Sequence, residues 1–354
     1  VFYDLPLAKY GESLAGAQVK VEVVKSGTAQ EYVVTSRTIT NRTWKGMAWN
    51  GAVFCTLGQG SAYCATSPDG VIWTEHLMPV SKYWFDIITN GKIFVALGFG
   101  SVCTSSDGIN WIERTMPSNH YCTSGCWNGK MFLVITDSGP FFTSSDGISW
   151  LPQTAPLAGL GRGNGYYLGV AWNGSVFVTV AAFSTGDILY SQTGLTGSWA
   201  VATIPLGGSG WNNIGVKGSR FVITSDGPPG THVSDDGINW SYYPTNFPGF
   251  GDTIVTDGTV FCATSYGNYA ISEDGITWDV KPFPGGSVNG WRAMCWNGAV
   301  FAAARNSGGI AATILPYTIS ASDVPLSSVV TSECLNRGLL TSGDIDTSTL
   351  TPRS

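Results

Sequence analysis

The sequence predicts an all-β fold, a seven-bladed β-propeller with four-stranded antiparallel blades. Two motifs and their spacing predict it: Asn-Gly or a close variant occurs seven times at intervals of 38 to 45 residues, and Ser-x-Asp-Gly-x-x-Trp occurs five times. A period of about 40 residues with several short strands is typical of propellers. The first motif stands at Asn50-Gly51, Asn90-Gly91, Asn128-Gly129, Asn173-Gly174, Lys217-Gly218, Asp257-Gly258 and Asn297-Gly298.

Each repeat is expected to supply four short strands. In the first repeat they are 44–49 before Asn-Gly, 53–56 after it, 62–67 before Asp-Gly, and a last strand centred on Trp73. Because Asn-Gly tolerates positive φ, we expect a two-residue type I′ turn between the first two strands. A single blade cannot bury both of its faces, whereas packing against neighbours in a closed ring buries them.

The Ser-x-Asp-Gly-x-x-Trp motif has a structural explanation. An Asp side chain can accept hydrogen bonds from backbone amides further along, which fixes the turn, and the Trp then packs on the blade face. The motif resembles the Asp-box of sialidase-type propellers and is one residue shorter, and a degraded copy ends at Trp199. The predicted turn aspartates are Asp69, Asp107, Asp146, Asp236 and Asp274.

The ring has a seam at its last repeat. Residues 291–315 lack the Asp-Gly-x-x-Trp ending, and the alternating segment 31–38 is expected to supply the missing strand. This gives three parts: an N-terminal flank at 1–30, the propeller at 31–317, and a C-terminal flank at 318–354. The C-terminal flank is expected to contain a short helix, since Val329, Val330, Cys334 and Leu335 have helical spacing and Gly338 suits a helix end.

Composition excludes some classes of protein. The net charge is −6 with 18 Lys and Arg and no basic run, which argues against binding nucleic acid. No stretch of 18 apolar residues is present, so no membrane span is expected. The eight cysteines lie mostly in apolar, strand-like stretches and are predicted to be buried thiols, with disulfides or a metal site as alternatives. The chain lacks a starting Met and is expected to be a processed or internal segment.

The two flanks resemble the tail-tip hub proteins of long-tailed phages and gene transfer agents. The matching segments are 2–11, 21–24 and 329–346. The resemblance implies a virion structural protein of the tail tip, or baseplate, that is assembled in the host cytoplasm and carries the propeller as an insertion. It also implies a homotrimer, with other tail proteins and a host surface glycan or protein as partners in host attachment.

No catalytic residue, metal or cofactor is predicted. The nine arginines do not recur at matching positions, as the carboxylate grip of a sialidase requires, and the three histidines occupy unrelated positions. A glycosidase needs a pair of carboxylates. Asp86 lies in the first strand of a repeat, which often lines a propeller channel, and is interpreted as a structural acceptor. The sequence therefore favours a binding protein, with a glycan-cleaving tail enzyme or a bacterial adhesion or scaffold propeller as alternatives.

Aromatic residues between repeats are candidates for ligand contacts, because they can stack on sugar rings or anchor a protein interface. Four tryptophans share one position across repeats and are assigned to packing: Trp44, Trp84, Trp211 and Trp291. The aromatic residues assigned to ligand binding are Tyr121, Tyr166, Tyr167, Tyr242, Tyr243 and Phe250.

Overall fold

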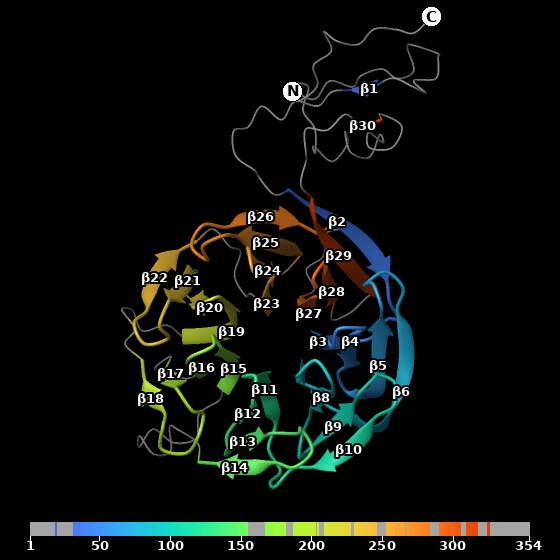
Figure 1. Ribbon diagram of the computed structural model, residues 1–354. Helices are drawn as coiled ribbons and strands as arrows, with labels where there is room; N and C mark the ends of the chain where they lie inside the picture. The colour runs from blue at the N-terminus through green and yellow to red at the C-terminus, as the bar shows by residue number, and fades with distance from the viewer. Residues whose placement is uncertain are drawn as a thin grey trace, which may run out of the picture. The chain divides into compact units, whose positions relative to one another are not determined.

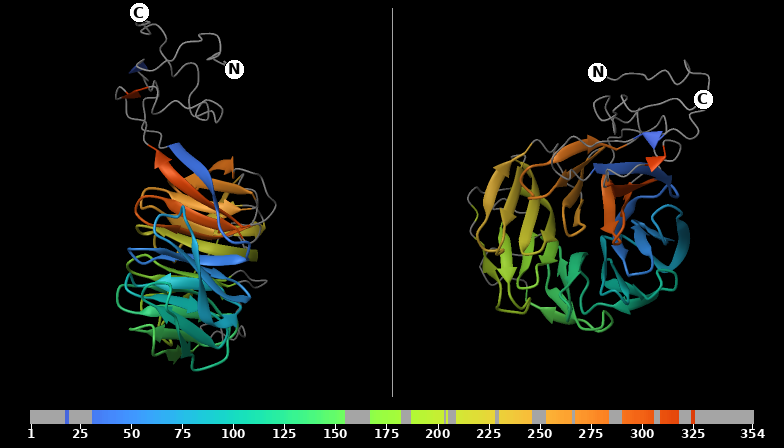
Figure 2. Two further views of the ribbon diagram at one scale, coloured as in Figure 1. Left: turned by 90° about the vertical axis from the view of Figure 1, so that its right-hand side faces the viewer. Right: turned by 45° about the horizontal axis from the view of Figure 1, so that its top comes forward.

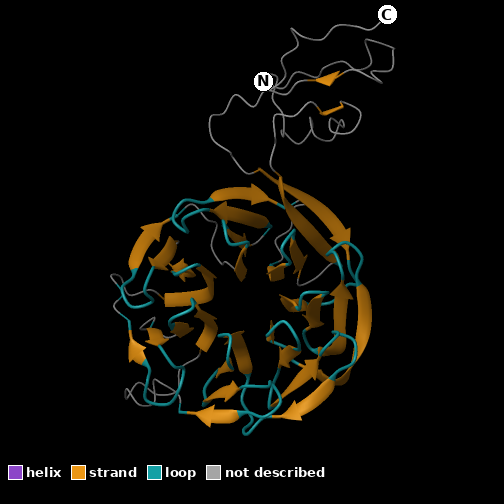
Figure 3. Cartoon of the chain, viewed as in Figure 1, coloured by secondary structure: helices purple, strands orange, loops and turns teal. Residues whose placement is uncertain are grey.

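Seven four-stranded sheets stand around a central axis, and no helix occurs in the part of the chain that is described (Figures 1 and 3). The predicted seven-bladed propeller is thus confirmed. Contacts divide the chain into a unit of residues 34–315, which holds the ring, and a unit of residues 1–33 and 316–354. The computed structural model describes residues 18–19, 31–154, 167–181, 187–202, 204, 209–227, 230–245, 253–265, 267–283, 290–305, 309–317 and 324–325.

The first strand of each blade lies nearest the axis, and the second follows it outward (Figure 1). The first strands are β3 (Trp44–Trp49), β7 (Asp86–Thr89), β11 (Cys122–Trp127), β15 (Tyr167–Trp172), β19 (Ser209–Lys217), β23 (Thr253–Thr256) and β27 (Trp291–Trp296). The second strands are β4 (Phe54–Gly58), β8 (Phe94–Leu97), β12 (Phe132–Thr136), β16 (Phe177–Ala181), β20 (Arg220–Gly227), β24 (Phe261–Ser265) and β28 (Phe301–Arg305).

The third and fourth strands complete each blade toward the rim (Figure 1). The third strands are β5 (Ser61–Ser67), β9 (Ser101–Ser105), β13 (Phe141–Ser144), β17 (Ile188–Ser191), β21 (Gly230–Ser234), β25 (Asn268–Ser272) and β29 (Ile310–Tyr317). The fourth strands are β6 (Thr74–Lys82), β10 (Ile112–Thr115), β14 (Leu151–Gln153), β18 (Ala200–Val201), β22 (Ser241–Pro244), β26 (Asp279–Pro282) and β2 (Glu31–Thr38).

The ring is closed by a strand from the N-terminal side of the chain. The last blade has the order β2-β29-β28-β27, so residues 31–38 supply its outer strand as the sequence predicted (Figure 2). In the other unit, β1 (Gln18–Val19) pairs antiparallel with β30 (Val324–Pro325). Apart from this pair, the flanks at 1–30 and 318–354, with the expected helix at 329–335, lie outside the described residues.

A phenylalanine at the start of the second strand forms the centre of every blade. All seven are completely buried, and four of them lie within 4.4–4.7 Å of a Trp ring at the end of the first strand. The motif Trp also packs near this Phe, as in Phe54–Trp73 at 6.3 Å and Phe132–Trp150 at 6.3 Å. These aromatic groups anchor apolar clusters that join neighbouring blades. The buried phenylalanines are Phe54, Phe94, Phe132, Phe177, Phe221, Phe261 and Phe301.

The aspartate motif forms the turn between the third and fourth strands, as predicted. In the second blade, Asp107 Oδ1 accepts hydrogen bonds from the N–H groups of Ile109 and Asn110, each at 2.8 Å, and from Ser105 Oγ at 2.9 Å. The N–H of Gly108 donates to Ser105 Oγ at 2.9 Å. The same pattern occurs at Asp69, Asp146, Asp236 and Asp274. The fourth strand begins after the motif Trp rather than being centred on it.

Hydrogen bonds from backbone N–H groups stabilise the charged form of these carboxylates. The N–H of Val71 holds the pKa of Asp69 below its ordinary value, and the N–H groups of Ser149 and Ile148 do the same for Asp146. The turn aspartates therefore remain ionised at neutral pH and act as acceptors inside the turn.

The Asn-Gly turns differ from the two-residue type I′ turn that was expected. Trp49 pairs with Phe54, so four residues separate the strands, and Asn50 Oδ1 accepts hydrogen bonds from the N–H groups of Ala52 and Val53, each at 3.0 Å. Asparagine can fix a turn by accepting backbone hydrogen bonds with its own side chain, and a turn of this kind forms here instead of type I′. Among the connections between first and second strands, only that of the fifth blade has two residues, since Lys217 pairs with Arg220.

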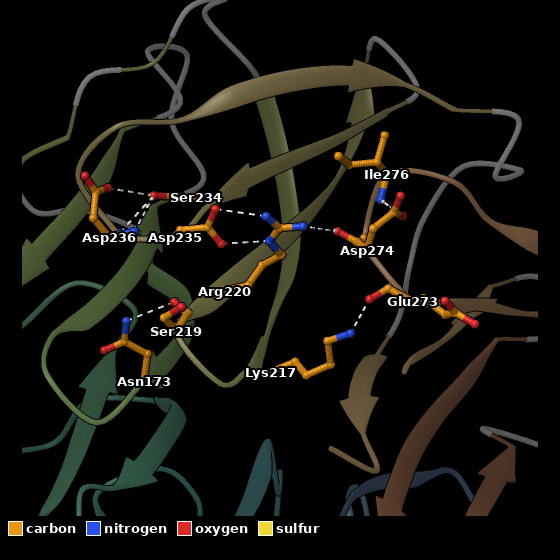
Figure 4. Close-up of polar contacts among 12 residues, drawn as sticks. Asn173, Lys217, Ser219, Arg220, Ser234, Asp235, Asp236, Glu273, Asp274 and Ile276 are labelled. Carbon is orange, nitrogen blue, oxygen red and sulfur yellow. Dashed lines mark hydrogen bonds and ion pairs between the residues drawn. The ribbon is translucent and has the colours of Figure 1, made fainter. Parts of the chain in front are cut away.

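The Asn-Gly turns and the aspartate turns lie at one edge of the ring, the turn edge. Polar contacts at this edge also join blades (Figure 4). Arg220 makes a bidentate ion pair with Asp235 at 2.7 and 2.9 Å, and its third nitrogen donates to the carbonyl of Asp274 in the next blade at 3.1 Å. Lys217 donates to the carbonyl of Glu273. The side-chain amide of Asn173 donates to the carbonyl of Ser219 in the following blade at 3.0 Å.

The cysteines in the described part of the chain are all free thiols, as predicted. Five are buried and two are partly buried, and Cys334 lies outside the described residues. Burial raises the pKa of Cys103 to about 12, so this thiol remains protonated. The described part of the chain contains no helix with the length and apolar character needed to cross a membrane. The seven free cysteines are Cys55, Cys64, Cys103, Cys122, Cys126, Cys262 and Cys295.

The motif glycine lies where one blade touches the previous one, and this contact can be tested. Gly108 has a φ of +74°, and a Cβ there would lie 2.8 Å from Cγ2 of Thr66 in the neighbouring blade. Gly91 has a φ of +82°, with nothing within 4 Å of its Cβ position. Gly91→Ala should cost about 1 kcal/mol from backbone strain alone, whereas Gly108→Ala should cost about 2–4 kcal/mol because overpacking adds to the strain. Chemical denaturation measures both, and equal losses would contradict the interblade role.

Candidate binding site

The inner strands of all seven blades surround a central cavity of about 500 Å³. Five of these strands contain an irregular register step near the N-terminal end, for example between Lys45 and Met47 and between Trp291 and Ala293. A β-bulge of this kind changes the direction of side chains and is common beside binding sites. The inner strands thus bring side chains from every repeat to one cavity.

Three charged side chains line this cavity among the described residues: Lys45, Asp86 and Arg292. Lys45 and Arg292 occupy equivalent positions in neighbouring blades, each directly after the buried Trp that begins its strand. Asn213 and Ser124 add polar groups from two further blades. The cavity can thus offer both positive and negative hydrogen-bonding partners to a polar ligand.

Asp86 is held firmly in the cavity wall. Its Oδ1 accepts a hydrogen bond from the N–H of Ile87 at 2.8 Å, and its Oδ2 accepts one from Ser124 Oγ in the next blade at 3.0 Å. On the other side, Gly46 leaves room for the carboxylate, since a Cβ there would lie 3.2 Å from Asp86 Oδ1. Burial raises the pKa of Asp86 to about 6, against the hydrogen bonds from Ile87 and Ser124 that lower it. The proposed acceptor role of this residue agrees with its contacts.

An aromatic cluster of Phe85, Phe99 and Tyr121 adjoins the cavity. Phe85 lines the cavity itself, and its ring lies 5.4 Å from that of Tyr121 in an edge-on arrangement. The ring of Phe99 lies 4.7 Å from that of Tyr121 in a tilted arrangement. Phe99 is 42% exposed and Tyr121 is 40% exposed, so the cluster leaves ring surface open to solvent. Ring surface beside a polar cavity suits a ligand with both apolar faces and hydroxyl groups.

Backbone hydrogen bonds fix this aromatic cluster. The N–H of Asp137 donates to the carbonyl of Tyr121 at 3.0 Å, while the N–H of Tyr121 donates to Asp137 Oδ1 at 3.2 Å. Phe99 and Tyr121 also form an antiparallel β-bridge. These bonds hold in place the backbone that carries Phe99 and Tyr121, and an ordered backbone lowers the entropic cost of binding a ligand.

Only one of the four described candidate residues is in this site. Tyr121 is part of the aromatic cluster. The assignment of Tyr167 to ligand binding is wrong. Its side chain is completely buried, with its ring 4.6 Å from that of Phe141, so it belongs to the core between blades rather than to a surface loop. Tyr242 and Tyr243 lie on the outer strand β22 rather than in an irregular loop, and both are partly buried.

The remaining sequence-based assignments have separate outcomes. The Tyr242 ring lies 5.1 Å from His232, and Tyr243 packs against the cluster between the fifth and sixth blades. Tyr166 and Phe250 lie outside the described residues. The packing role of Trp44, Trp84 and Trp291 is confirmed, since they are at most 2% exposed. No group of three potential metal ligands occurs within the described residues.

Solved structures with a similar fold come from proteins of different functions. YCF48 bound to D1 peptide is 14% identical with a TM-score of 0.64, over 86% of this chain and 99% of that one. YCF48 from Cyanidioschyzon merolae is 14% identical with a TM-score of 0.61, over 79% and 98%. Virginiamycin B lyase from Staphylococcus aureus is 11% identical with a TM-score of 0.65, over 81% and 100%. At such low identities the likeness shows the propeller fold alone.

No model of a known protein family matches the sequence, and no curated protein sequence matches it.

The raised pKa of Asp86 gives a test of its environment. Because the pKa of Asp86 is higher in the folded protein than in the unfolded chain, its ionisation lowers the free energy of unfolding as the pH rises from about 4 to about 6. Asp86→Asn keeps the shape and carries no charge, so it should remove this loss and stabilise the protein at pH 7 by up to about 3 kcal/mol. Thermal unfolding from pH 4 to pH 8 measures the effect. A variant with the same pH profile as the original protein would contradict this environment.

Proposed function

We propose that this chain is a non-catalytic structural protein of a phage tail tip, whose propeller binds a host surface glycan beside its central cavity. The flank segments that resemble tail-tip hub proteins support the location. The aromatic cluster of Phe85, Phe99 and Tyr121 carries the binding function, because it presents partly exposed rings next to the polar cavity wall. Sugar rings stack on aromatic faces while their hydroxyl groups bind charged and amide side chains.

The cavity favours binding over hydrolysis. A glycosidase uses two carboxylates, one on each side of the scissile bond. Of the residues described around the cavity, Asp86 supplies the single carboxylate, and both of its oxygens accept hydrogen bonds from the protein. Such an acceptor can hold a sugar hydroxyl group and keep the wall of the cavity in place.

A glycan-cleaving enzyme is the second candidate, and the pKa of Asp86 near 6 favours it because a general acid must retain a proton near neutral pH. Incubating the protein with host surface polysaccharide and measuring new reducing ends separates the two candidates. Release of reducing ends that Asp86→Asn abolishes would support the enzyme and contradict the binding proposal.

Binding to the host surface is tested with the full chain and purified host polysaccharide. Tyr121→Ala and Phe99→Ala should each weaken binding about tenfold, because an aromatic stacking contact contributes on the order of 1 kcal/mol or more. Leu77→Ala is the matched control, since Leu77 is 68% exposed on the outer strand of the first blade and does not line the cavity. Equal binding by all three variants would exclude the aromatic cluster as the binding site.

The location is tested on intact particles. Antibodies against the propeller, viewed by electron microscopy, should label the tail tip of a phage that encodes this chain. Light scattering should give the mass of a trimer, as the resemblance implies. Labelling of bacterial cells and not of particles would favour the bacterial adhesion or scaffold protein instead.

A further inference from the structure

A second cavity, of about 380 Å³, lies between the second and third blades on the turn edge of the ring. Ile93, Trp111, Ile112 and Arg114 line it from the second blade, and Ile148 lines it from the turn motif of the third. Ile112 is 55% exposed and Ile148 is 44% exposed, so this groove has open aliphatic walls. The aromatic cluster lies near the opposite ends of the inner strands, so the groove is a separate surface.

The corresponding position between the third and fourth blades is occupied by the chain itself. The degraded motif at 191–199 is two residues longer than the other copies, and its extra segment contains Thr196. The N–H and Oγ1 of Thr196 both donate to Gln153 Oε1, at 3.0 and 3.1 Å. The N–H of Thr154 donates to Thr196 Oγ1 at 3.0 Å. An inserted segment thus covers the outer strand of the third blade.

Arg114 occupies the position of Gln153 in the uncovered groove. Arg114 Nε donates to Oγ1 of Thr104 at 3.1 Å, and Gln153 Nε2 donates to Oγ1 of Thr143 at 3.1 Å. Each of the two side chains therefore donates a hydrogen bond to the equivalent threonine of the third strand in its own blade. Where Gln153 accepts a hydrogen bond from the chain's own segment, Arg114 is a donor only. Its two terminal nitrogens donate no other hydrogen bond to a described residue, and they can bind an incoming acceptor.

We propose that the groove between the second and third blades is a docking site for an extended segment of a partner protein, in which an acidic residue follows an aliphatic one. The aliphatic side chain packs between Ile112 and Ile148, the exposed aliphatic walls of the groove. The acidic side chain takes the place of Thr196 and accepts charge-assisted hydrogen bonds from Arg114. The neighbouring Glu113 does not compete for Arg114, because it pairs with Lys82 and Ser101.

An extended segment also fits the edge of the blade. β10 is the last strand of its sheet, so one side of its backbone has no partner strand. Strand edges of this kind bind extended peptides, with side-chain pockets that give specificity. This inference does not depend on the proposed glycan site, because the two surfaces share no residue.

The probe is a labelled, blocked peptide copied from the covered interface, Thr-Gly-Leu-Glu-Gly-Ser, in which Glu replaces the Thr of the chain. The full-length protein should bind it saturably, and more tightly than the same peptide with Thr. Arg114→Gln, which copies the third blade, should weaken binding of the Glu peptide about tenfold and leave the Thr peptide nearly unchanged. Fluorescence polarisation measures both peptides.

A second variant blocks the groove without removing a residue from it. Insertion of Thr-Gly after Ile148 copies the longer turn of the fourth blade and should abolish binding. Leu151→Ala is the control. Leu151 holds the position of Ile112 in the third blade and is 67% exposed, but it does not line the groove, so its truncation should leave binding unchanged. Circular dichroism confirms that each variant is folded.

Two results would overturn the proposal. One is the absence of saturable binding of the Glu peptide at millimolar concentration. The other is a dimer of this chain that Arg114→Gln dissociates, since the groove would then serve self-association rather than a partner.

Discussion

The fold depends on the contact between the aspartate turn, in the five blades that carry the motif, and the blade before it. At this contact a glycine with positive φ lies where no Cβ fits: Gly108 against Thr66, and Gly147 against Ile93 and Val95. Serine and aspartate side chains hold the turn in the required shape, and the motif Trp covers the central Phe of its own blade. One short motif therefore ends a hairpin and also fits two sheets together, so much of the stability lies between blades.

The sequence was sufficient for the ring because the informative features were periodic or local. The repeats predicted seven blades, the incomplete last repeat predicted the closing strand, and hydrogen-bonding chemistry predicted the role of aspartates such as Asp107. The turn type was wrong because Asn-Gly is compatible with two geometries. Local preference alone does not reveal that Asn50 accepts hydrogen bonds from Ala52 and Val53. Strand register selects between these geometries, and register is set by packing across the blade.

The candidate site was harder to predict, because its residues are far apart in the chain and differ between repeats. Asp86 could be placed near the axis, but Lys45 and Arg292 become visible only when repeats are aligned on the Trp before them. The same alignment gives Tyr167 the position of Trp44, which explains its burial. The sequence does not reveal that Phe85 and Phe99 form a cluster with Tyr121, since three separate segments bring them together.

The closing strand has a mechanical consequence. β2 begins at Glu31 and the neighbouring β29 ends at Tyr317, and adjacent strands of a blade run in opposite directions, so both chain ends leave the ring at the same end of one strand pair (Figure 1). Tension between the flanks would load the hydrogen bonds of this pair one after another rather than all together. The ring would then open at this blade, one hydrogen bond after another, while the other six blades remain paired.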